Sequence, residues 1–559
     1  MSRILFRHFA YRFVDNDLIA ADGETHQTAA NIIAICAGFG FTLAVFQALK
    51  YSFGGGTAAF ERLRPTTVLL DQELLISLSM LAAAIATALS WDALFPERRD
   101  CLVLGPLPLK TTQLLTAKLS AVLVVIFLLV GVTLACPALI MPFLAEPTFL
   151  AILRSLLIEI VILFAAAAFV FFAFLAFQAL LLHLLPYRIY LAVSPVIQVA
   201  LLLGSLAMFM LVPNFTALQK QGGGIAWWLP PAWFLVLQQN WLGVQPPLPS
   251  PLGTLALQAL SAVSVSAILL YAGGFRRTMK KAVESSELSL SPPRLIRRAY
   301  EALLNATLLR DPKRRTVFWF TARSIARNPK HRLLLSIYFA AGFVWVVQGL
   351  QHGLRVTGGR GPTLPNAAQL TMPLDFALFL LIGLRVLFAL PVALPANWIF
   401  RITESGAASR YLSGARTFLR FAALVPVAVI PFPIYASIWG WKIALIHTTF
   451  LTLIALLLVE RLLWRFPKIP FTCSYLPGKA NLKARLGAYF ILFIGLSSFL
   501  SAIEINLLRS ETAWMKVLPF FAIVLAVVIW RRRRIEGDLE RFQFEETTAW
   551  WFARLNLER

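Results

Sequence analysis

Long apolar runs separated by short polar segments dominate the chain. A helix needs roughly 20 apolar residues to cross a bilayer core about 30 Å thick. Runs of that kind predict twelve membrane spans, at about residues 29–49, 74–93, 114–138, 155–184, 190–212, 252–273, 333–350, 374–394, 418–439, 442–462, 486–508 and 514–530. The run 155–184 is too long for a perpendicular span, so we expect it to tilt or to extend into water. The pattern predicts an all-α, polytopic membrane protein with about 12 transmembrane helices.

The composition agrees with this prediction. Of the 559 residues, 59% are hydrophobic and 14% are charged, whereas a soluble domain has roughly 45–50% apolar and about 25% charged residues. The formal net charge of +24 would suggest a nucleic-acid partner in a soluble protein. In a polytopic protein Lys and Arg collect in cytoplasmic loops, so the lipid bilayer is the predicted partner and nucleic acid is not.

The distribution of the basic residues predicts the orientation. With the N-terminus inside, about 40 of the 51 Lys and Arg residues fall on the cytoplasmic side, as the positive-inside rule requires. The largest group lies at 274–332, and Arg531 to Arg534 follow the last span. No signal peptide is recognised before the first span. We therefore expect a multi-pass protein of the cell inner (plasma) membrane with both termini in the cytoplasm.

Three segments outside the spans have an amphipathic or aromatic character. Leu5, Phe9 and Phe13 recur every four residues, which predicts an interfacial helix before the first span; a disordered basic tail is the alternative. The segment 316–332 is aromatic and basic, and a helix there should break at Asn328-Pro329. In 213–251, prolines and glycines argue against regular helix and tryptophans suggest an interfacial or re-entrant element.

A basic linker at 274–315 divides the predicted spans six and six, into a first half, 1–273, and a second half, 316–559. Each half opens with an interfacial elbow and carries a polar cytoplasmic loop between its second and third spans. These loops, 91–118 and 397–416, both begin at a tryptophan at the membrane edge and both end in a basic residue. Duplicated halves commonly form a transport pathway at their interface.

The first loop carries charged residues, then leucines and prolines, and then a lysine that opens the next span. In order, these are Glu97, Arg98, Arg99, Asp100, Pro106, Pro108 and Lys118. In this it resembles the permeases of type 2 ATP-binding-cassette exporters. The second loop keeps Arg401, Glu404 and Arg416 but lacks the prolines. The alternative is an ordinary solvated loop whose charges only set the topology.

The resemblance implies that these loops dock on separate ATP-binding-cassette ATPase subunits at the cytoplasmic face. The chain contains no G-x-x-x-x-G-K-[ST] sequence, so it has no P-loop of its own for nucleotide phosphates. The function expected from the resemblance is that of a permease, the membrane-spanning component of an ATP-driven exporter. The chain itself is then not an enzyme, and no catalytic, cofactor or metal site is predicted in it.

Two other functions remain open. A secondary, ion-coupled transporter would use ionisable residues inside spans, and Arg385 is placed near the middle of span eight, with Glu159, His447 and Glu504 toward the outer ends of theirs. A lipid-modifying enzyme would need grouped acids or histidines. The nearest candidates are the acidic segment 15–24 and a lone Cys473. The four cysteines are scattered without a C-x-x-C pair, which argues against a thiolate metal site.

The orientation can be tested by cysteine accessibility labelling in intact cells. Single cysteines in 213–251 should react with an impermeant reagent, and those in 276–330 should be protected, because the positive-inside rule places the second segment in the cytoplasm. The reverse pattern would overturn the orientation and, with it, the cytoplasmic position of the two loops.

Overall fold

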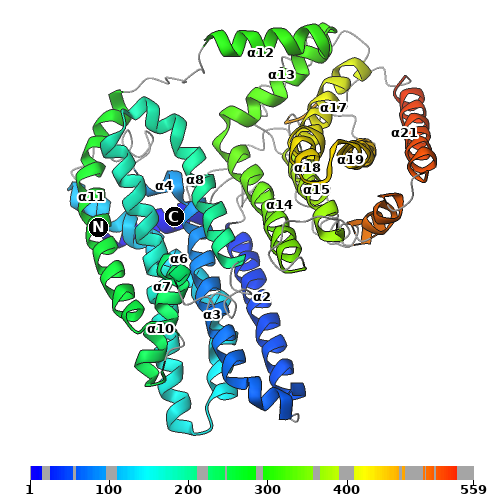
Figure 1. The fold of residues 1–559 in the computed structure, drawn as a ribbon. Helices are drawn as coiled ribbons and strands as arrows, with labels where there is room; N and C mark the ends of the chain where they lie inside the picture. Colours follow the sequence, from blue (N-terminus) through cyan, green and yellow to red (C-terminus); the bar gives the residue numbers. More distant parts are fainter. Residues whose placement is uncertain are drawn as a thin grey trace, which may run out of the picture. The chain divides into compact units, whose positions relative to one another are not determined.

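The described part of the chain folds into helices, with no strand among the described residues. The structure is a computed structural model, and it describes residues 2–14, 25–54, 58–95, 110–210, 224–245, 248–284, 294–356, 366–388, 408–464, 469–471, 495–497, 499–508 and 512–537. The chain divides into two compact units, unit 1 (Met1–Leu290) and unit 2 (Ser291–Arg559) (Figure 1). The boundary falls within the predicted linker, and the division into two six-span halves stays a prediction.

Ten of the described helices are long and apolar enough to cross a membrane. The predicted spans 333–350 and 486–508 correspond only to shorter apolar helices, Leu334–Leu350 and Gly495–Leu508. The prediction of an all-helical, multi-pass membrane protein is therefore confirmed, whereas the count of twelve spans is not. The ten candidate spans are Ile32–Phe53, Arg64–Leu89, Thr111–Ala145, Phe149–Leu184, Val193–Met210, Pro251–Phe275, Gln369–Leu387, Tyr411–Trp439, Trp441–Leu462 and Trp514–Arg534.

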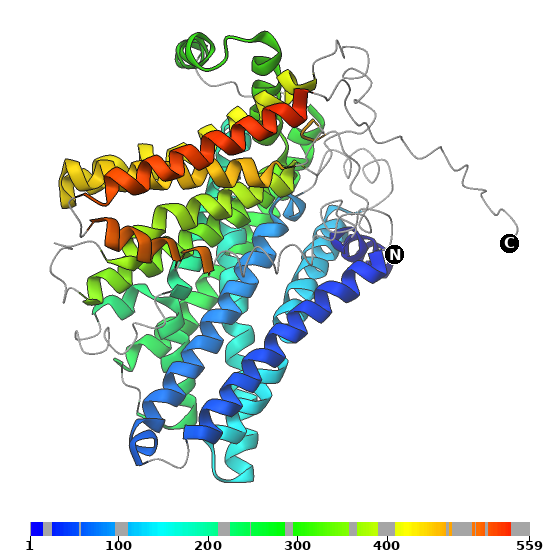
Figure 2. The same cartoon turned by 90° about the vertical axis from the view of Figure 1, so that its right-hand side faces the viewer.

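Unit 1 is built around long helices that run along one another (Figures 1 and 2). Helix α6 lies against α2, α3 and α7, and α3 also packs on α7 and α8. At 36 residues, α7 is about 54 Å long, well beyond the bilayer core, so it must tilt or project into water. The helices of unit 1 are α1 (Ser2–Val14), α2 (Thr25–Gly54), α3 (Ala58–Leu89), α4 (Trp91–Leu94), α6 (Thr111–Ala145), α7 (Phe149–Leu184), α8 (Tyr187–Met210), the 3-10 helix η2 (Gly224–Trp228), α10 (Pro230–Leu242) and α11 (Pro251–Glu284).

The predictions for two segments of unit 1 outside the candidate spans had different outcomes. Residues 2–14 form a helix, as predicted, and Leu5 and Phe9 are buried within unit 1, where α1 packs on α6. The prediction of irregular structure in 213–251 was wrong for 230–242. There Pro230 and Pro231 begin the regular helix α10, because a proline at the first helical position removes an N–H that has no intrahelical partner.

Unit 2 consists of shorter helices whose ends are fixed by proline and glycine. Asp311 caps α13 by accepting the N–H of Lys313 at 3.0 Å, and α13 ends at Arg327 immediately before Asn328-Pro329, as predicted. The helices are α12 (Arg294–Thr307), α13 (Pro312–Arg327), α14 (Pro329–Val356), α15 (Ala367–Leu387), α17 (Ala408–Leu424), a π-helical segment η4 (Val425–Val429), α18 (Pro431–Trp439), α19 (Trp441–Leu462) and α21 (Trp514–Gly537).

A helical hairpin in unit 2 depends on a single glycine. Helices α17 and α18 are joined through the π-helical segment that contains Pro426, whose missing N–H interrupts the regular hydrogen-bond ladder. Gly440 then separates α18 from α19 with φ at +87°, a backbone conformation that side chains with a Cβ rarely adopt. The chain therefore reverses within one residue, and the two helices pack on each other.

The close approach of α2 and α6 can be tested with two glycines on one helix. A Cβ on Gly40 would lie 2.1 Å from the carbonyl oxygen of Thr133, whereas a Cβ on Gly38 would have nothing within 4 Å. Gly40→Ala should lower the free energy of unfolding in detergent by about 1–3 kcal/mol, because the two backbones must separate. Gly38→Ala should be neutral or stabilising by up to about 1 kcal/mol. Equal effects of the two substitutions would contradict this packing.

Candidate functional site

Most of the residues that the sequence assigns to the coupling loops lie outside the described residues. These are Glu97, Arg98, Arg99, Asp100, Pro106, Pro108, Arg401 and Glu404. Lys118, Arg385 and Arg416 are described. Phe95, within the predicted loop 91–118, and Phe388, nine residues before the predicted loop 397–416, are also described, and both are buried. The geometry around Phe95 shows how the start of the first loop is held in unit 1.

The start of the first loop is held by side chains from several helices of unit 1. Trp91, at the start of α4, is buried, and its ring N–H donates to the hydroxyl of Ser194 in α8 at 2.7 Å. The carbonyl oxygen of Trp91 accepts a hydrogen bond from the side-chain amide of Gln178 in α7 at 2.9 Å. That amide also lies 3.1 Å from the hydroxyl of Tyr190. These contacts tie α4 to α7 and α8.

Two further carbonyl groups at this point accept side-chain donors. The hydroxyl of Tyr271 in α11 donates to the carbonyl of Leu94 at 2.6 Å, and the ammonium of Lys118 in α6 donates to the carbonyl of Phe95 at 2.8 Å. The ring of Phe95 meets that of Tyr271 edge to face at 5.0 Å between centroids. The last carbonyls of a helix have no intrahelical partner, and here α6 and α11 supply the donors.

Lys118 joins a third element to this anchor. Its ammonium lies 5.4 Å from the centroid of the Phe9 ring in α1, and the residue is only 5% exposed. A buried ammonium is stabilised by a carbonyl at a helix end and by the face of an aromatic ring. We call the group of Trp91, Leu94, Phe95, Lys118 and Tyr271 the loop anchor. Together with Phe9 and Gln178, it connects the interfacial helix, the loop and three candidate spans of unit 1.

In unit 2, Phe388 follows the last residue of α15, nine residues before the predicted second loop. The carbonyl of Phe388 accepts the backbone N–H of Phe471 at 3.1 Å. The two rings are 5.7 Å apart, and Phe471 also stacks on His331 at 4.8 Å between centroids. Phe388 is therefore a buried phenylalanine whose carbonyl is hydrogen-bonded, as Phe95 is in unit 1.

The structure describes the helix positions of Arg385 and Glu159. Helix α15 ends at Leu387, so Arg385 lies in its last turn, and its Nε donates to the carbonyl of Leu462 at the end of α19 at 2.9 Å. Helix α7 begins at Phe149, so Glu159 lies ten residues, about 15 Å, along it. Its carboxylate is buried without a hydrogen-bond partner among the described residues.

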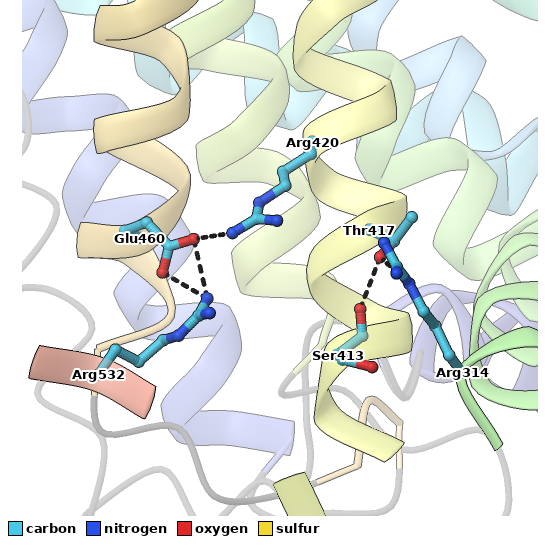
Figure 3. Close-up of polar contacts among 6 residues, drawn as sticks. All are labelled: Arg314, Ser413, Thr417, Arg420, Glu460 and Arg532. Carbon is cyan, nitrogen blue, oxygen red and sulfur yellow. Dashed lines mark hydrogen bonds and ion pairs between the residues drawn. The ribbon is translucent and has the colours of Figure 1, made fainter. Parts of the chain in front are cut away.

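An ion-pair cluster joins three helices of unit 2 at the end that is predicted to be cytoplasmic (Figure 3). Glu460, near the end of α19, is buried, and its carboxylate accepts from Arg420 of α17. The same carboxylate receives two hydrogen bonds from Arg532 of α21, at 2.9 and 2.8 Å. Burial of a carboxylate is costly unless it is paired, and here two guanidinium groups from different helices pair with it.

Two further arginines extend this cluster. Arg416 of α17 is 5% exposed and lies within the electrostatic reach of Arg420, Arg532 and Glu460. Arg314 of α13 donates to the hydroxyl of Thr417 at 2.7 Å, and this hydroxyl donates to the carbonyl of Ser413 at 2.8 Å (Figure 3). Burial and the charge of Arg420 lower the pKa of Arg314, and Asp311 partly offsets this effect. We call Arg314, Arg416, Arg420, Glu460 and Arg532 the arginine cluster.

A second buried pair lies elsewhere in unit 2. The Nδ1 of His447 in α19 is hydrogen-bonded to the carboxylate of Glu504, and both side chains are almost fully buried. The ring of Tyr435 is 4.9 Å from that of His447. The sequence predicts that His447 and Glu504 lie toward the outer ends of successive spans, and this similar depth could have indicated that they pair. A similar predicted depth could also have indicated the pairing of Glu460 with Arg420 and Arg532.

The two candidates for an enzymatic site, the acidic segment 15–24 and Cys473, lie outside the described residues. Within the described residues no group of three or more His, Cys, Asp or Glu could hold a metal ion. In comparisons with known proteins, no protein family, no characterised protein and no solved structure matches the chain.

The loop anchor can be tested at Lys118. In Lys118→Met the carbonyl of Phe95 loses its donor at a buried position, which should lower the free energy of unfolding by about 1–3 kcal/mol. Amide hydrogen exchange in residues 91–95 should also become faster. Lys110→Met, an exposed lysine just before α6, is the matched control and should change stability by less than about 0.5 kcal/mol. Equal behaviour of the two variants would contradict the anchoring role of Lys118.

Proposed function

We propose that this protein is the membrane-spanning permease of an ATP-driven exporter, with both halves in one chain and with separate ATPase subunits at its cytoplasmic face. The proposal rests first on the order of charged residues and prolines in 97–118 and on the layout of the spans. The observation that supports it best is the loop anchor. A loop that transmits force must be attached rigidly to the helices that it moves.

The anchor meets this mechanical requirement in three ways. The carbonyls of Trp91, Leu94 and Phe95 are all hydrogen-bonded to side chains of other helices. The side chains of these three residues are buried, so displacement of the loop would expose apolar surface. The donors come from α6, α7 and α11, so a displacement of the loop is passed to three candidate spans of unit 1. An ordinary solvated loop needs none of these contacts.

The second loop would engage a second ATPase in the same manner. Phe388, nine residues before the loop, accepts a backbone hydrogen bond from Phe471. Arg385 joins the end of α15 to the end of α19 through its hydrogen bond to Leu462. Because the second loop lacks the prolines of the first, its docking is expected to be weaker. The substrate would pass between the halves, and its chemical class stays open.

Docking can be tested by charge reversal in the first loop. In Glu97→Arg/Asp100→Arg the reversed charges would face like charges across a partly desolvated contact, which can cost about 2–5 kcal/mol. A P-loop ATPase, detected by mass spectrometry, should therefore co-purify poorly with the tagged variant while membrane insertion is unchanged. Reversal at Arg401 and Glu404 should have a smaller effect. Glu146→Arg, on the predicted outer side, is the control. Unchanged recovery of the ATPase would remove the docking assignment.

Transmission can be separated from docking with a variant of the loop anchor. Tyr271→Phe removes the donor to Leu94 but leaves every charge of the loop in place. The ATPase should co-purify normally, and its coupling to the permease, measured as the change in ATPase activity on reconstitution, should fall. Loss of both docking and coupling in this variant would show that Tyr271 acts only through folding.

An ion-coupled transporter is the second candidate, and the His447–Glu504 pair favours it. Buried ionisable pairs in membrane helices commonly carry protons or ions, and this pair lies in the apolar interior of unit 2. The pull-down distinguishes the two functions. Absence of any co-purifying P-loop ATPase, together with proton uptake by vesicles that contain the wild-type chain alone, would favour the ion-coupled transporter.

A further inference from the structure

An unpaired carboxyl group is buried among the helices of unit 1. Glu159 in α7 is 2% exposed, and neither oxygen of its carboxyl group has a hydrogen-bond partner among the described residues. Leu157 and Val161, two residues to either side of it, are exposed, as expected at a level where α7 faces lipid tails. An ionised carboxyl group is strongly destabilised in such surroundings, and ionisable groups inside membrane helices commonly bind protons or ions.

Glu159 lies on the side of α7 that meets α3. The hydroxyl of Ser79 in α3 donates to the carbonyl of Leu163 at 2.6 Å, and Glu159 is one turn before Leu163 on the same face. Gln72 lies about two turns before Ser79, so it shares the face of α3 that meets α7. The two helices run in the same direction, since the end of α7 is hydrogen-bonded to Trp91, just beyond the end of α3. Glu159 and Gln72 therefore lie at neighbouring levels.

Helix α10 packs against both α3 and α7 and adds amide side chains. The amide of Gln239 donates to the side-chain oxygen of Gln72 at 2.6 Å. Phe234 packs on Phe169 of α7, with 5.8 Å between the ring centroids, and Gln238 lies one turn further along the same face. Gln238 is 1% exposed, and its side-chain nitrogen has no hydrogen-bond partner within the described part of the chain.

The level of Gln238 matches that of Glu159. Helix α10 runs opposite to α7, because its start packs on the middle of α7 while the carbonyl of Trp241, at its end, accepts from Arg154 at 2.6 Å. Arg154 lies about one and a half turns before Glu159, and Trp241 lies about one turn after Gln238. The unpaired carboxyl and the unpaired amide thus face the same space among α3, α7 and α10. Asn240, two residues after Gln238, is exposed, so polar side chains continue to the surface.

Few other titratable side chains lie near this level. Helix α10 has none, and those of α8 and α11 fall in 187–190 and 271–284, toward the other end of α7. The remaining ones on the helices around Glu159 are Asp71 and Glu73 in α3, Cys136 in α6 and Arg154 in α7. Asp71 is paired with Lys50 at 2.8 Å, and Arg154 donates to the end of α10. No basic side chain of the described residues pairs with Glu159.

We propose that Glu159 binds and releases a proton and that Gln238 stabilises its deprotonated form. With the proton bound, the carboxyl group is neutral and tolerates burial. After the proton leaves, the unpaired side-chain N–H of Gln238 donates to the carboxylate. The other amides provide hydrogen-bond partners between Glu159 and the exposed end of α10. The proposal requires only that unit 1 be embedded in a bilayer, so it does not depend on either proposed function.

A proton suits this site better than a divalent metal ion does. In the described part of the chain, no group of three or more His, Cys, Asp or Glu residues could hold a metal. Glu159 would offer a single carboxylate, whereas divalent ions take several oxygen ligands.

The proposal is tested with the purified full chain in phosphatidylcholine vesicles. Dicyclohexylcarbodiimide, an apolar reagent that modifies protonated carboxyl groups, is added, and peptide mass spectrometry locates the adduct. Glu159 should be labelled at low pH, and its labelling should fall about ten-fold for each pH unit once most of the carboxyl has lost its proton. Asp71 is the internal control, and its ion pair with Lys50 should prevent labelling. Constant labelling of Glu159 from about pH 5 to about pH 10, no labelling of it at any pH, or equal labelling of Asp71 would overturn the proposal.

Gln238→Leu tests the role of the amide. A hydrogen bond to a charged acceptor is lost in this variant, so at a pH where the wild type is mostly deprotonated the variant should be labelled about ten-fold more at Glu159. The fold should persist, because the side-chain nitrogen of Gln238 has no partner to lose among the described residues. Gln258→Leu, the same change at an exposed position of α11, is the matched control and should label as the wild type does. Identical labelling of all three proteins would contradict the proposed role of Gln238.

Glu159→Gln measures the proton directly. The glutamine keeps the size and neutrality of the protonated carboxyl group, so the variant should fold. When the pH of a weakly buffered vesicle suspension is raised, a pH indicator should show that the wild type releases about one proton per chain more than the variant does. No difference between the two would mean that Glu159 does not exchange its proton, and the proposal would be wrong.

A last arm separates a proton from a sodium ion. Labelling of the wild type is repeated at one pH in sodium chloride and in choline chloride of equal concentration. The proton assignment predicts equal labelling of Glu159 in the two salts. Protection that occurs in sodium chloride alone would show that a metal cation occupies the site and would overturn the proton assignment.

Discussion

Backbone carbonyls cannot be left without hydrogen-bond donors in or near the hydrocarbon core, because no water is available there to replace a lost partner. Inside a helix the ladder satisfies them, but the last turn of every helix leaves carbonyls exposed. In this protein, side chains and backbone groups of other helices supply the missing donors. Lys118, Tyr271 and Gln178 do so in unit 1, and Phe471 and Arg385 do so in unit 2. These bonds join the ends of helices to neighbouring helices within each unit.

Charged side chains follow the same constraint. An isolated charge in an apolar medium is unstable, whereas a charge paired across helices contributes to packing. Glu460 joins α17, α19 and α21 through Arg420 and Arg532, and Glu504 is held by His447. The two groups differ in exposure, since the side chain of Arg420 is partly exposed whereas both side chains of the His447–Glu504 pair are almost fully buried.

The proposed transport mechanism depends on how firmly the loops are attached. A loop on a flexible connection would absorb the motion of an ATPase, whereas a loop that begins at a buried, hydrogen-bonded aromatic residue passes the motion to the helices behind it. Phe95, near the start of the first loop, meets this condition. Helix α17 follows the second loop, and the ion pairs of Glu460 join α17 to α19 and α21.

The sequence by itself determined what depends on local chemistry and on depth in the membrane. Apolar runs located the membrane helices, Asn328-Pro329 located the break between α13 and α14, and the spacing of Leu5 and Phe9 identified α1 as amphipathic. Hydropathy changes gradually at the ends of a helix, so the predicted span edges differ from the helix bounds of α7 and α15.

Only the tertiary structure decided which side chains meet. The partners of Glu460 lie 40 and 72 residues away in the chain, and that of His447 lies 57 residues away. Lys118 finds its acceptor across the whole of the first loop. Hydropathy gives the depth of a residue along the membrane normal, but it gives neither the neighbour of a helix nor the face that the helix turns toward it. The packing of all the helices in a unit determines both the neighbour and the face, and it brought together the residues of the loop anchor and of the arginine cluster.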